Sequence, residues 1–264
     1  MSVRIHVFGR LRVDDGDVVL SSRGFDGRKP RQVLQILAAH DGRAVSKDRL
    51  ADLLWRDEPP ADPDGSVEHY VAVLRRRLRR PGRDEPSLVQ TDASGYRLDV
   101  DSAWLDLAAF RCAAADMTTW LHLDRVRDAL RLSDAEPFAD EPDSAWAVDV
   151  RREVSGRRSD LLVRAAELGL AEGDPLAAAR DAAGAIVLEP HLESAHRALI
   201  AAHYVHGDQA RALTAYRSLR DRLVAELGVE PTPHTRALHD AILHHSRTDE
   251  VLRRLTVPQG LRSA

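Results

Sequence analysis

The sequence has one cysteine, Cys112, in 264 residues, so it forms no disulfide bond within the chain and has no cysteine pair for a metal or redox site. It also has no uninterrupted apolar run near the roughly 20 residues that a membrane-spanning helix needs. Residues 1–13 lack the basic, apolar and small-residue order of a secretory leader. These absences lead us to expect a cytoplasmic protein without a membrane partner.

Acidic and basic residues are nearly balanced, with a net charge of -4, which argues weakly against a protein that coats nucleic acid. The distribution is uneven, because residues 1–100 hold 18 Lys and Arg against 16 Asp and Glu, whereas the rest of the chain holds 20 against 26. One basic cluster contains no acid and comprises Arg75, Arg76, Arg77, Arg79, Arg80 and Arg83. The charge that bears on function is therefore local.

Two extended regions flank a helical stretch in the first part of the chain. Residues 3–13 alternate in part between apolar and polar side chains, residues 14–17 have the composition of a turn, and residues 18–20 resume the extended pattern. Residues 88–100 are typical of two short strands around a turn at residues 92–95. We predict a hairpin or small sheet at the start and a second hairpin after the helices.

Three helices are predicted between these strands. Apolar residues after Pro30 recur with helical spacing until Gly42 ends the first helix. Ser46 has the position and chemistry of an N-cap for the second helix, which ends before the proline pair at residues 59–60. A turn and cap at residues 62–66 begin the third. This order predicts a winged helix-turn-helix domain with an N-terminal sheet over the first hundred residues.

From about Trp104 onward the pattern is helical. Two breaks, Gly173-Asp174 and Gly207-Asp208, are 34 residues apart, which is the period of tetratricopeptide (TPR) repeats. Small, aromatic and proline residues match that repeat at Ala178, Ala182, Ala185, Pro190, Ala212 and Tyr216. We therefore predict a mainly α protein with a small β part, in which an all-α, TPR-like domain at residues 101–250 precedes a C-terminal tail at residues 251–264. An unrelated helical bundle is the alternative for the second domain.

The basic cluster lies on the third helix. At 3.6 residues per turn, one side of this helix is an apolar core stripe of Val67, Tyr70, Val71, Leu74 and Leu78. The opposite side holds His69, Ala72, Val73, Arg76, Arg79 and Arg80, with Arg75 and Arg77 at its flanks. The planar fork of arginine donates two hydrogen bonds to guanine, and small side chains allow close approach to a base edge. This face therefore has the composition of a DNA recognition surface.

The predicted roles divide between bases and phosphates. We expect Arg76, Arg80 and His69 to read bases, and Arg75, Arg77 and Arg79 to contact phosphates. Arg97 alternates with two apolar neighbours on the second hairpin, so it faces outward where a wing reaches DNA. Lys47, in the first turn of the second helix, is a further phosphate candidate. The alternative is that these cations are solvated and that the arginines only complement the helix dipole.

Longer stretches of the chain resemble a known family. Residues around VFGRLRV, GRKPRQVLQILAAHDGRAVSKDRLADLLW, HYVAVLRRRLRR and GYRLDV resemble the OmpR-type winged helix. Residues around AVDVRREVSGRRSDLL and ELGVEPTPHTRALHDAIL resemble the bacterial transcriptional activator domain. In this order they resemble the Streptomyces antibiotic regulatory protein family.

The resemblance implies an activator that binds direct repeats near a promoter and recruits RNA polymerase holoenzyme, often for a secondary-metabolite gene cluster, with a homodimer forming on DNA. It also implies that the third helix enters the major groove and that Arg97 lies on the wing. Trp55 takes the position of the tryptophan that ends the family's second helix, where it approaches the DNA backbone or packs as a core aromatic.

Two other functions are alternatives to DNA binding. An enzyme or metalloprotein would need a catalytic or ligand constellation, but only His203 and His206 share a helical face among the candidate histidines, and no carboxylate accompanies them at ligand spacing. We expect no catalytic residue, metal or cofactor. The other alternative is a helical-repeat scaffold that binds a protein partner while the N-terminal domain does not read DNA.

Overall fold

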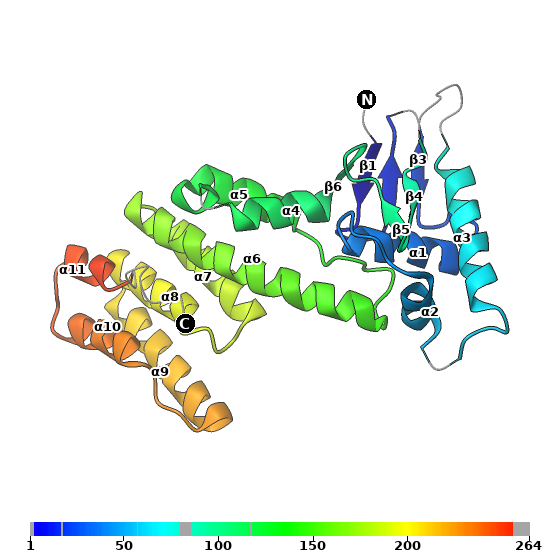
Figure 1. Cartoon of the computed structure of the whole chain (residues 1–264). Coiled ribbons are helices and arrows are strands. Elements are labelled where there is room, and N and C mark those ends of the chain that lie inside the picture. The colour runs from blue at the N-terminus through cyan, green and yellow to red at the C-terminus, as the bar shows by residue number, and fades with distance from the viewer. Residues whose placement is uncertain (1–2, 17, 57, 80–85, 117, 256–264) are drawn as a thin grey trace. The chain divides into compact units, whose positions relative to one another are not determined.

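A computed structural model of the chain describes residues 3–16, 18–56, 58–79, 86–116 and 118–255 (Figure 1). The predicted fold class is confirmed: the described chain is mainly helical, and its strands belong to two small sheets near the N-terminus. No helix in the described ranges is long and apolar enough to cross a membrane.

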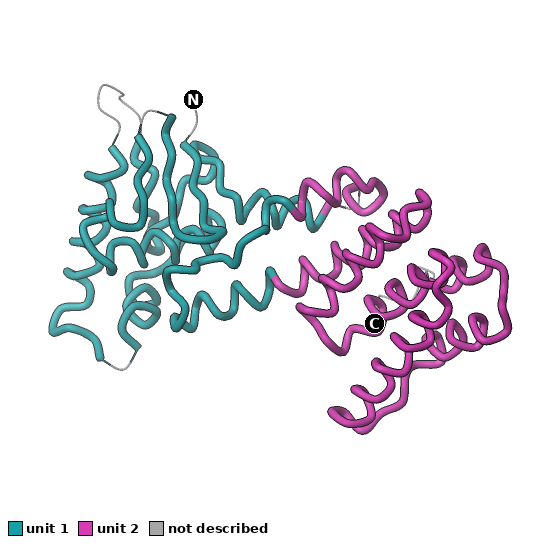
Figure 2. Tube along the Cα trace, turned by 180° about the vertical axis from the view of Figure 1, so that it is seen from behind, with its two compact units in different colours: residues 1–115, 131–154 teal, residues 116–130, 155–264 magenta. Residues whose placement is uncertain are grey.

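The chain forms two compact units (Figure 2). Unit 1 contains residues 1–115 and 131–154, and unit 2 contains residues 116–130 and 155–264. This division differs from the boundary expected at residue 100, because the chain after that residue adds a strand, a helix and a returning segment to the winged-helix part. Sequence reasoning placed all of that material in the second domain.

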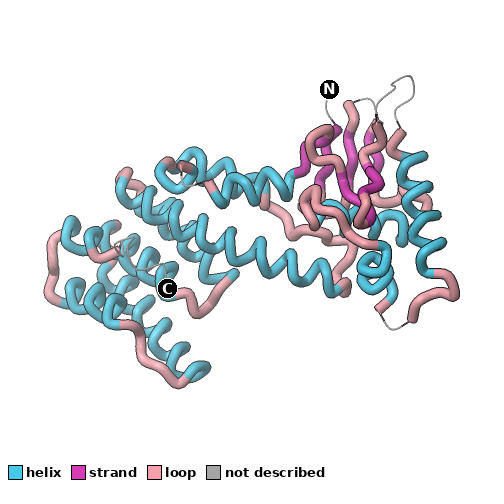
Figure 3. The backbone as a smooth tube through the Cα atoms, viewed as in Figure 1, coloured by secondary structure: helices cyan, strands magenta, loops and turns pink. Residues whose placement is uncertain are grey.

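Unit 1 begins with a four-stranded sheet of order β3-β2-β1-β6 (Figure 3). Its strands are β1 (Val3–His6), β2 (Arg12–Asp14), β3 (Val19–Ser21) and β6 (Ala103–Leu105). The first three pair antiparallel, and the predicted turn separates β2 from β3, whereas the stretch 3–13 that was expected to be extended divides into β1 and β2. Strand β6 pairs in parallel with β1 and was expected to be helical. Ala103 and Leu105 are buried on either side of the half-buried Trp104, but three residues are too short to show a period of two in the sequence.

Three helices pack beside this sheet: α1 (Arg28–Ala39), α2 (Lys47–Trp55) and α3 (Pro63–Arg77). The predicted cap of α2 is confirmed, since Ser46 Oγ accepts from the Arg49 amide at 3.2 Å. Asp62 caps α3 in the same way through the Gly65 amide at 2.9 Å. The apolar stripes of the helices meet in one core, whose fully buried members include Val33, Leu34, Ile36, Leu37, Leu50, Val67 and Leu74.

The second sheet is the hairpin of β4 (Val89–Asp92) and β5 (Gly95–Leu98), as predicted. An isolated bridge attaches it to the segment before α2, because the Val45 amide donates to the Tyr96 carbonyl at 2.8 Å and the Tyr96 amide donates back at 2.9 Å. Helix α4 (Asp106–Ala115) follows β6. Hydrogen bonds therefore join the hairpin to the segment that leads into α2.

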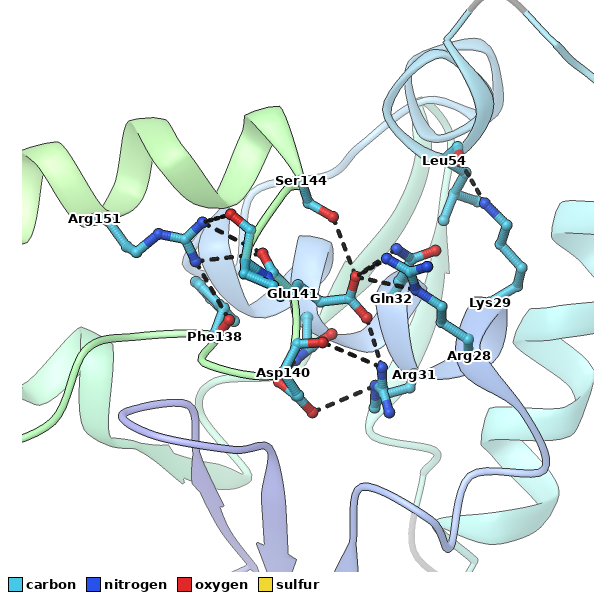
Figure 4. Close-up of polar contacts among 12 residues, drawn as sticks. Arg28, Lys29, Arg31, Gln32, Leu54, Phe138, Asp140, Glu141, Ser144 and Arg151 are labelled. Atoms are coloured by element: carbon cyan, nitrogen blue, oxygen red, sulfur yellow. Dashed lines mark hydrogen bonds and ion pairs between the residues drawn. The ribbon is translucent and has the colours of Figure 1, made fainter.

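A segment of the predicted second domain returns to unit 1 after α5 (Leu123–Leu132). The Phe138 amide donates to the Val7 carbonyl at 2.8 Å, and the Gly9 amide donates to the Glu136 carbonyl at 2.9 Å. Glu141, three residues after the buried Phe138, is fully buried against α1 (Figure 4). Helix α6 (Ala145–Ala171) begins directly after this segment.

Unit 2 contains the predicted helical repeats, with α7 (Pro175–Leu188), α8 (Glu193–Val205), α9 (Gln209–Leu227), α10 (Pro233–Leu243) and α11 (Thr248–Arg253). Each of the two breaks, which are 34 residues apart, is followed by a helix start. There Asp174 and Asp208 accept from the amides of Ala177 and Arg211 at 2.9 Å. Of the small repeat residues, Ala185 lies in a smaller cluster with Val163 and Ala195, whereas Ala178, Ala182 and Ala212 lie in one core with Tyr216. Residues 251–255 were expected in a tail, but Val251 and Leu255 are buried in this core.

Candidate nucleic-acid interface

Helix α3 separates a buried face from an exposed one. Val67, Val71 and Leu74 are buried. His69, Ala72 and Arg76 are exposed and are spaced at i, i+3 and i+7, which places them in one stripe along the helix. The Arg76 side chain is 71% exposed. The predicted recognition face therefore exists as an accessible surface at these three positions.

Val73 departs from the predicted face. It is buried, with 6% exposed, whereas the helical wheel placed it beside Arg76 on the open side. Arg76 and Arg77 lie one turn further along α3, and both pair with Asp26 in the segment that precedes α1. A helical wheel takes no account of the elements that pack around α3, so it cannot predict the burial of Val73.

Asp26 is an acid held against the basic cluster. Arg77 Nε donates to Asp26 Oδ2 at 2.6 Å, and a second hydrogen bond joins Arg77 Nη2 to Asp26 Oδ1. Arg76 Nη2 donates to Asp26 Oδ2 at 3.2 Å. The hydrogen bond from Arg77 is the main reason that the pKa of the Asp26 carboxyl lies below its usual range, and Arg76 lowers the pKa further. Asp26 is therefore an anion that two arginines share.

Arg75 lies on the other flank of α3 and holds the hairpin. Its Nε donates to the Val89 carbonyl at 3.0 Å, and its Nη2 donates to Thr91 Oγ1 at 2.7 Å. Its guanidinium carbon lies 5.9 Å from the centre of the Tyr96 ring. Sequence reasoning expected Arg75 to contact phosphate and missed these contacts, because nothing local in the sequence indicates that β4 lies beside α3.

The remaining wing cation is also positioned by a neighbour. Arg97 Nη2 donates to the Gln90 side-chain oxygen on the facing strand, and Gln90 Nε2 donates to Asp99 Oδ2 at 2.8 Å. Arg97 is half-buried, so part of its surface stays accessible at the wing. The chain of contacts fixes where its guanidinium lies.

At the start of α2, Lys47 Nζ donates to Glu68 on α3, and this hydrogen bond is the main reason that the pKa of Lys47 is raised. Trp55, at the end of α2, is half-buried, with its ring centre 6.2 Å from that of Tyr70 and the ammonium of Lys29 5.5 Å above it. This placement gives Trp55 a packing role between α2 and α3 and leaves part of it accessible.

The end of the basic cluster lies beyond the helix. Helix α3 ends at Arg77, so the exposed Arg79 does not belong to the helical face on which the wheel placed it. Arg80 lies outside the residues that the structure describes, as does Arg83. Of the two arginines expected to read bases, Arg76 is the one that lies on the accessible face of the described helix.

No metal centre is found in the described part of the chain, where no three His, Cys, Asp or Glu side chains gather as ligands. His203 and His206, which share a helical spacing, are instead separated in role: His203 belongs to the last turn of α8 and His206 caps that helix. The pKa of His203 is lowered, chiefly by burial and then by the charge of Arg211.

Two family models match adjoining parts of the chain. The bacterial transcriptional activator domain matches residues 99–243, and the model described as the C-terminal part of a transcriptional regulatory protein matches residues 27–98. The two matches meet near residue 100, where sequence reasoning placed its boundary, even though the compact units divide elsewhere.

Similar proteins are transcriptional regulators. Transcriptional regulatory protein MoaR1 of Mycobacterium tuberculosis is 29% identical over 245 residues, which cover 86% of this chain and 76% of that protein. Regulatory protein DnrI of Streptomyces peucetius is 30% identical over 234 residues, which cover 82% and 84%. The structure of Mycobacterium tuberculosis EmbR in complex with a low affinity phosphopeptide matches with a TM-score of 0.81 and 25% identity, covering 96% of this chain and 69% of that one.

Proposed function

The chain belongs to the Streptomyces antibiotic regulatory protein family of transcriptional regulators, and from this premise we propose that it is a sequence-specific activator of a secondary-metabolite pathway. It binds direct repeats near a promoter and recruits RNA polymerase holoenzyme. The observation that carries the proposal is the exposed stripe of His69, Ala72 and Arg76 on α3, which is backed by a buried apolar face.

In this proposal the stripe enters the major groove. Arg76 donates its fork to guanine O6 and N7, and Ala72 leaves room for a base edge or touches a thymine methyl. His69, which lies one turn before Ala72 on α3, reads another base. Val73 is left out of the base-reading set because its side chain is buried, and Arg80 stays a prediction for this set from the sequence.

Phosphate contacts come from five cations and one tryptophan around the stripe. These side chains lie on α2, on α3, just after α3 or on the hairpin, so contacts on both sides of the groove would orient α3. The proposed set is Lys47, Trp55, Arg75, Arg77, Arg79 and Arg97.

The helical repeats of unit 2 take the remaining roles. Repeats of helix pairs form extended surfaces for protein partners. We assign to this unit the contact with polymerase and the formation of a homodimer on tandem sites. The protein would act in the cytoplasm, at the nucleoid when it is bound to DNA.

The test is a gel-shift selection across a library of promoter fragments at two salt concentrations. Wild type should enrich fragments with repeated sites, and its binding should weaken steeply with salt as counterions are released. Arg76→Ala should lose about 1–3 kcal/mol of binding free energy at selected sites. Arg152→Ala is the matched control, because Arg152 is 76% exposed on α6 and pairs with Asp149, as Arg76 pairs with Asp26.

Equal and weak binding of wild type and Arg76→Ala to every fragment would contradict the proposal. That result would favour the scaffold function, in which the repeats bind a protein segment. Transcription from a selected fragment with added RNA polymerase holoenzyme tests recruitment separately, since a protein that binds DNA without stimulating transcription is not an activator.

A further inference from the structure

Asp26 is placed where DNA phosphate would compete with it. Three consecutive arginines, Arg75 to Arg77, end α3, and Asp26 is the acid that pairs with the last two of them. The geometry to Arg77 is the parallel two-bond arrangement that guanidinium also forms with phosphate. One carboxylate therefore occupies donor groups on both the base-reading arginine and its flanking neighbour.

The backbone fixes this carboxylate in position. Asp26 has φ of 55°, in the left-handed region that Asp and Asn adopt more readily than most residues. The preceding Phe25 is fully buried, and the following Gly27 is the N-cap of α1. The acid is thus held between a core anchor and a helix start, so its contact with α3 is a feature of the folded domain.

The contact is also weak enough to be exchanged. The side chains of Asp26 and Arg77 are 32% and 45% exposed, and ion pairs of this kind contribute little to folding stability. Arg76 is bound at 3.2 Å through one nitrogen and is more exposed than Arg77. A ligand with matching acceptors can therefore displace Asp26 from Arg76 first, while Arg77 stays paired through Nε and Nη2 and offers phosphate its Nη1.

We propose that Asp26 is a specificity-determining residue of the DNA interface, which holds Arg77 and releases Arg76 only to a well-matched acceptor. The inference rests on the proposed function, because it presumes that α3 reads DNA. With Asp26 present, Arg76 and Arg77 are already paired when an unmatched duplex binds. The two arginines therefore contribute less binding free energy to random DNA. Specificity then comes partly from weakened binding to the wrong sequence.

The test uses the full chain with Asp26→Asn. Asparagine keeps the shape and tolerates the left-handed backbone, but it removes the charge. Asp52→Asn is the matched control, since it makes the same charge change at an exposed position on α2. Affinity is measured by fluorescence anisotropy for a selected promoter site and for a shuffled duplex over a range of salt, with thermal unfolding of each variant alongside.

We expect Asp26→Asn to bind the shuffled duplex more tightly and to show a lower ratio of selected to shuffled affinity. Each phosphate contact that a freed arginine gains should steepen the slope of log affinity against log salt by about 0.9. Between about 50 and 200 mM salt, the shuffled-DNA affinity should then fall about 3.5-fold more than that of wild type for each contact. Asp52→Asn should leave the ratio and the slope near wild type.

Three outcomes decide the matter. If wild type selects its site and Asp26→Asn matches it in affinity ratio and salt slope, the inference is wrong and the proposed function stands. If Asp26→Asn loses affinity for both duplexes equally, Asp26 only supports the helix, and the inference is again wrong. If wild type binds both duplexes equally, the proposed function fails and the inference fails with it.

Discussion

Arg31 and Glu141, which are 110 positions apart in the sequence, are joined by a hydrogen bond of 2.6 Å from Arg31 Nη2 to Glu141 Oε1 (Figure 4). The Glu141 side chain is fully buried, and it also accepts from Arg28 at 2.9 Å and from Gln32 at 2.7 Å. Ser144 donates to the same carboxylate from its own segment. Helix α1 of the winged helix is therefore bound to the chain that leads into α6.

Replacing Glu141 by glutamine should destabilise unit 1. The change removes a buried anion and leaves the guanidinium of Arg31, which is 15% exposed, with Asp140 as its remaining charge partner at 3.4 Å. Breaking a buried ion pair costs about 3–5 kcal/mol, and both the remaining pair with Asp140 and the exposure of Arg28 should bring this loss toward the lower end. Urea unfolding followed by circular dichroism measures it. Asp149→Asn, which breaks an exposed pair with Arg152, should cost under about 1 kcal/mol, and an equal loss in both variants would contradict the prediction.

The same carboxylate predicts a loss of stability in acid. Burial alone raises the pKa of Glu141, but hydrogen bonds from Arg28, Arg31 and Gln32 outweigh burial and hold the pKa below its usual range. A carboxyl with a lowered folded pKa contributes stability above its unfolded value, about 4.3, and loses that contribution as the pH falls through the folded pKa. As the pH is lowered from about 4.3, the unfolding free energy of Glu141→Gln should therefore decrease less than that of wild type.

A fragment that ends at residue 100 should be much less stable than one that ends at residue 154. The shorter fragment lacks β6, which pairs with β1, and lacks the fully buried Phe138. Removing a buried phenylalanine side chain alone costs about 3–5 kcal/mol. Thermal melting followed by circular dichroism compares the two fragments, and a fragment 1–100 that melts as cooperatively and as high as 1–154 would show that the returning segment is dispensable.

Gly95→Ala should detach the hairpin from the segment before α2. Gly95 has φ of 146°, and an added Cβ would lie 2.0 Å from the Val45 carbonyl oxygen. The backbone must then move, which breaks the two hydrogen bonds between Val45 and Tyr96, at about 1 kcal/mol each in addition to strain. Urea unfolding and amide exchange at Tyr96 measure the effect.

A second glycine provides the control for Gly95. Gly173 also has a positive φ, 85°, but an added Cβ there meets no atom within 4 Å. Gly173→Ala should therefore cost only the backbone strain, roughly 1 kcal/mol. If both substitutions cost the same, the close approach of Val45 to the hairpin does not determine the need for glycine at position 95.

Local chemistry accounts for what the sequence predicted well. Ser46 caps a helix because its hydroxyl accepts from an amide three residues later, and the period of two in β1 and β2 follows from one buried face. The 34-residue spacing marks two helix starts because Asp174 and Asp208 perform the same capping role. Each of these features depends on residues within one turn or one hairpin, so the pattern is visible in the sequence.

Contacts between distant residues account for what the sequence did not predict. Val73 is buried although the wheel of α3 places it on the open side, Arg75 donates to a strand that follows α3, and β6 is a strand because β1 offers it a free edge. No periodicity within α3 distinguishes an arginine that holds a hairpin from one that faces solvent. The candidate face was therefore predictable, but the partners that position its members were not.

Asp106 predicts a pH dependence of the opposite sign to that of Glu141. Both of its carboxylate oxygens accept from the Val7 amide at 3.0 Å, and the Leu107 amide donates to Oδ1 at 2.8 Å. Burial raises the pKa of Asp106 to about 6, although these backbone hydrogen bonds oppose the shift. The folded protein thus binds this proton more tightly than the unfolded chain does, for which the pKa is about 3.9. The contribution of Asp106 to stability should fall by roughly 2 kcal/mol as the pH rises from about 4 to 6, out of roughly 3 kcal/mol over its whole titration.

The substitution Asp106→Asn separates this titration from all others in the chain. Asparagine cannot titrate, and its amide group would face the Val7 or Leu107 donors, so the variant should be less stable by about 1–3 kcal/mol at neutral pH. The difference in unfolding free energy between wild type and variant should be larger at pH 4 than at pH 7, because only wild type gains from protonation there. Urea unfolding at both pH values measures this difference, and carboxyl NMR should place the Asp106 midpoint at about 6. A difference that stays constant from pH 4 to pH 7 would mean that Asp106 titrates as an ordinary carboxyl and that its backbone hydrogen bonds compensate fully for burial.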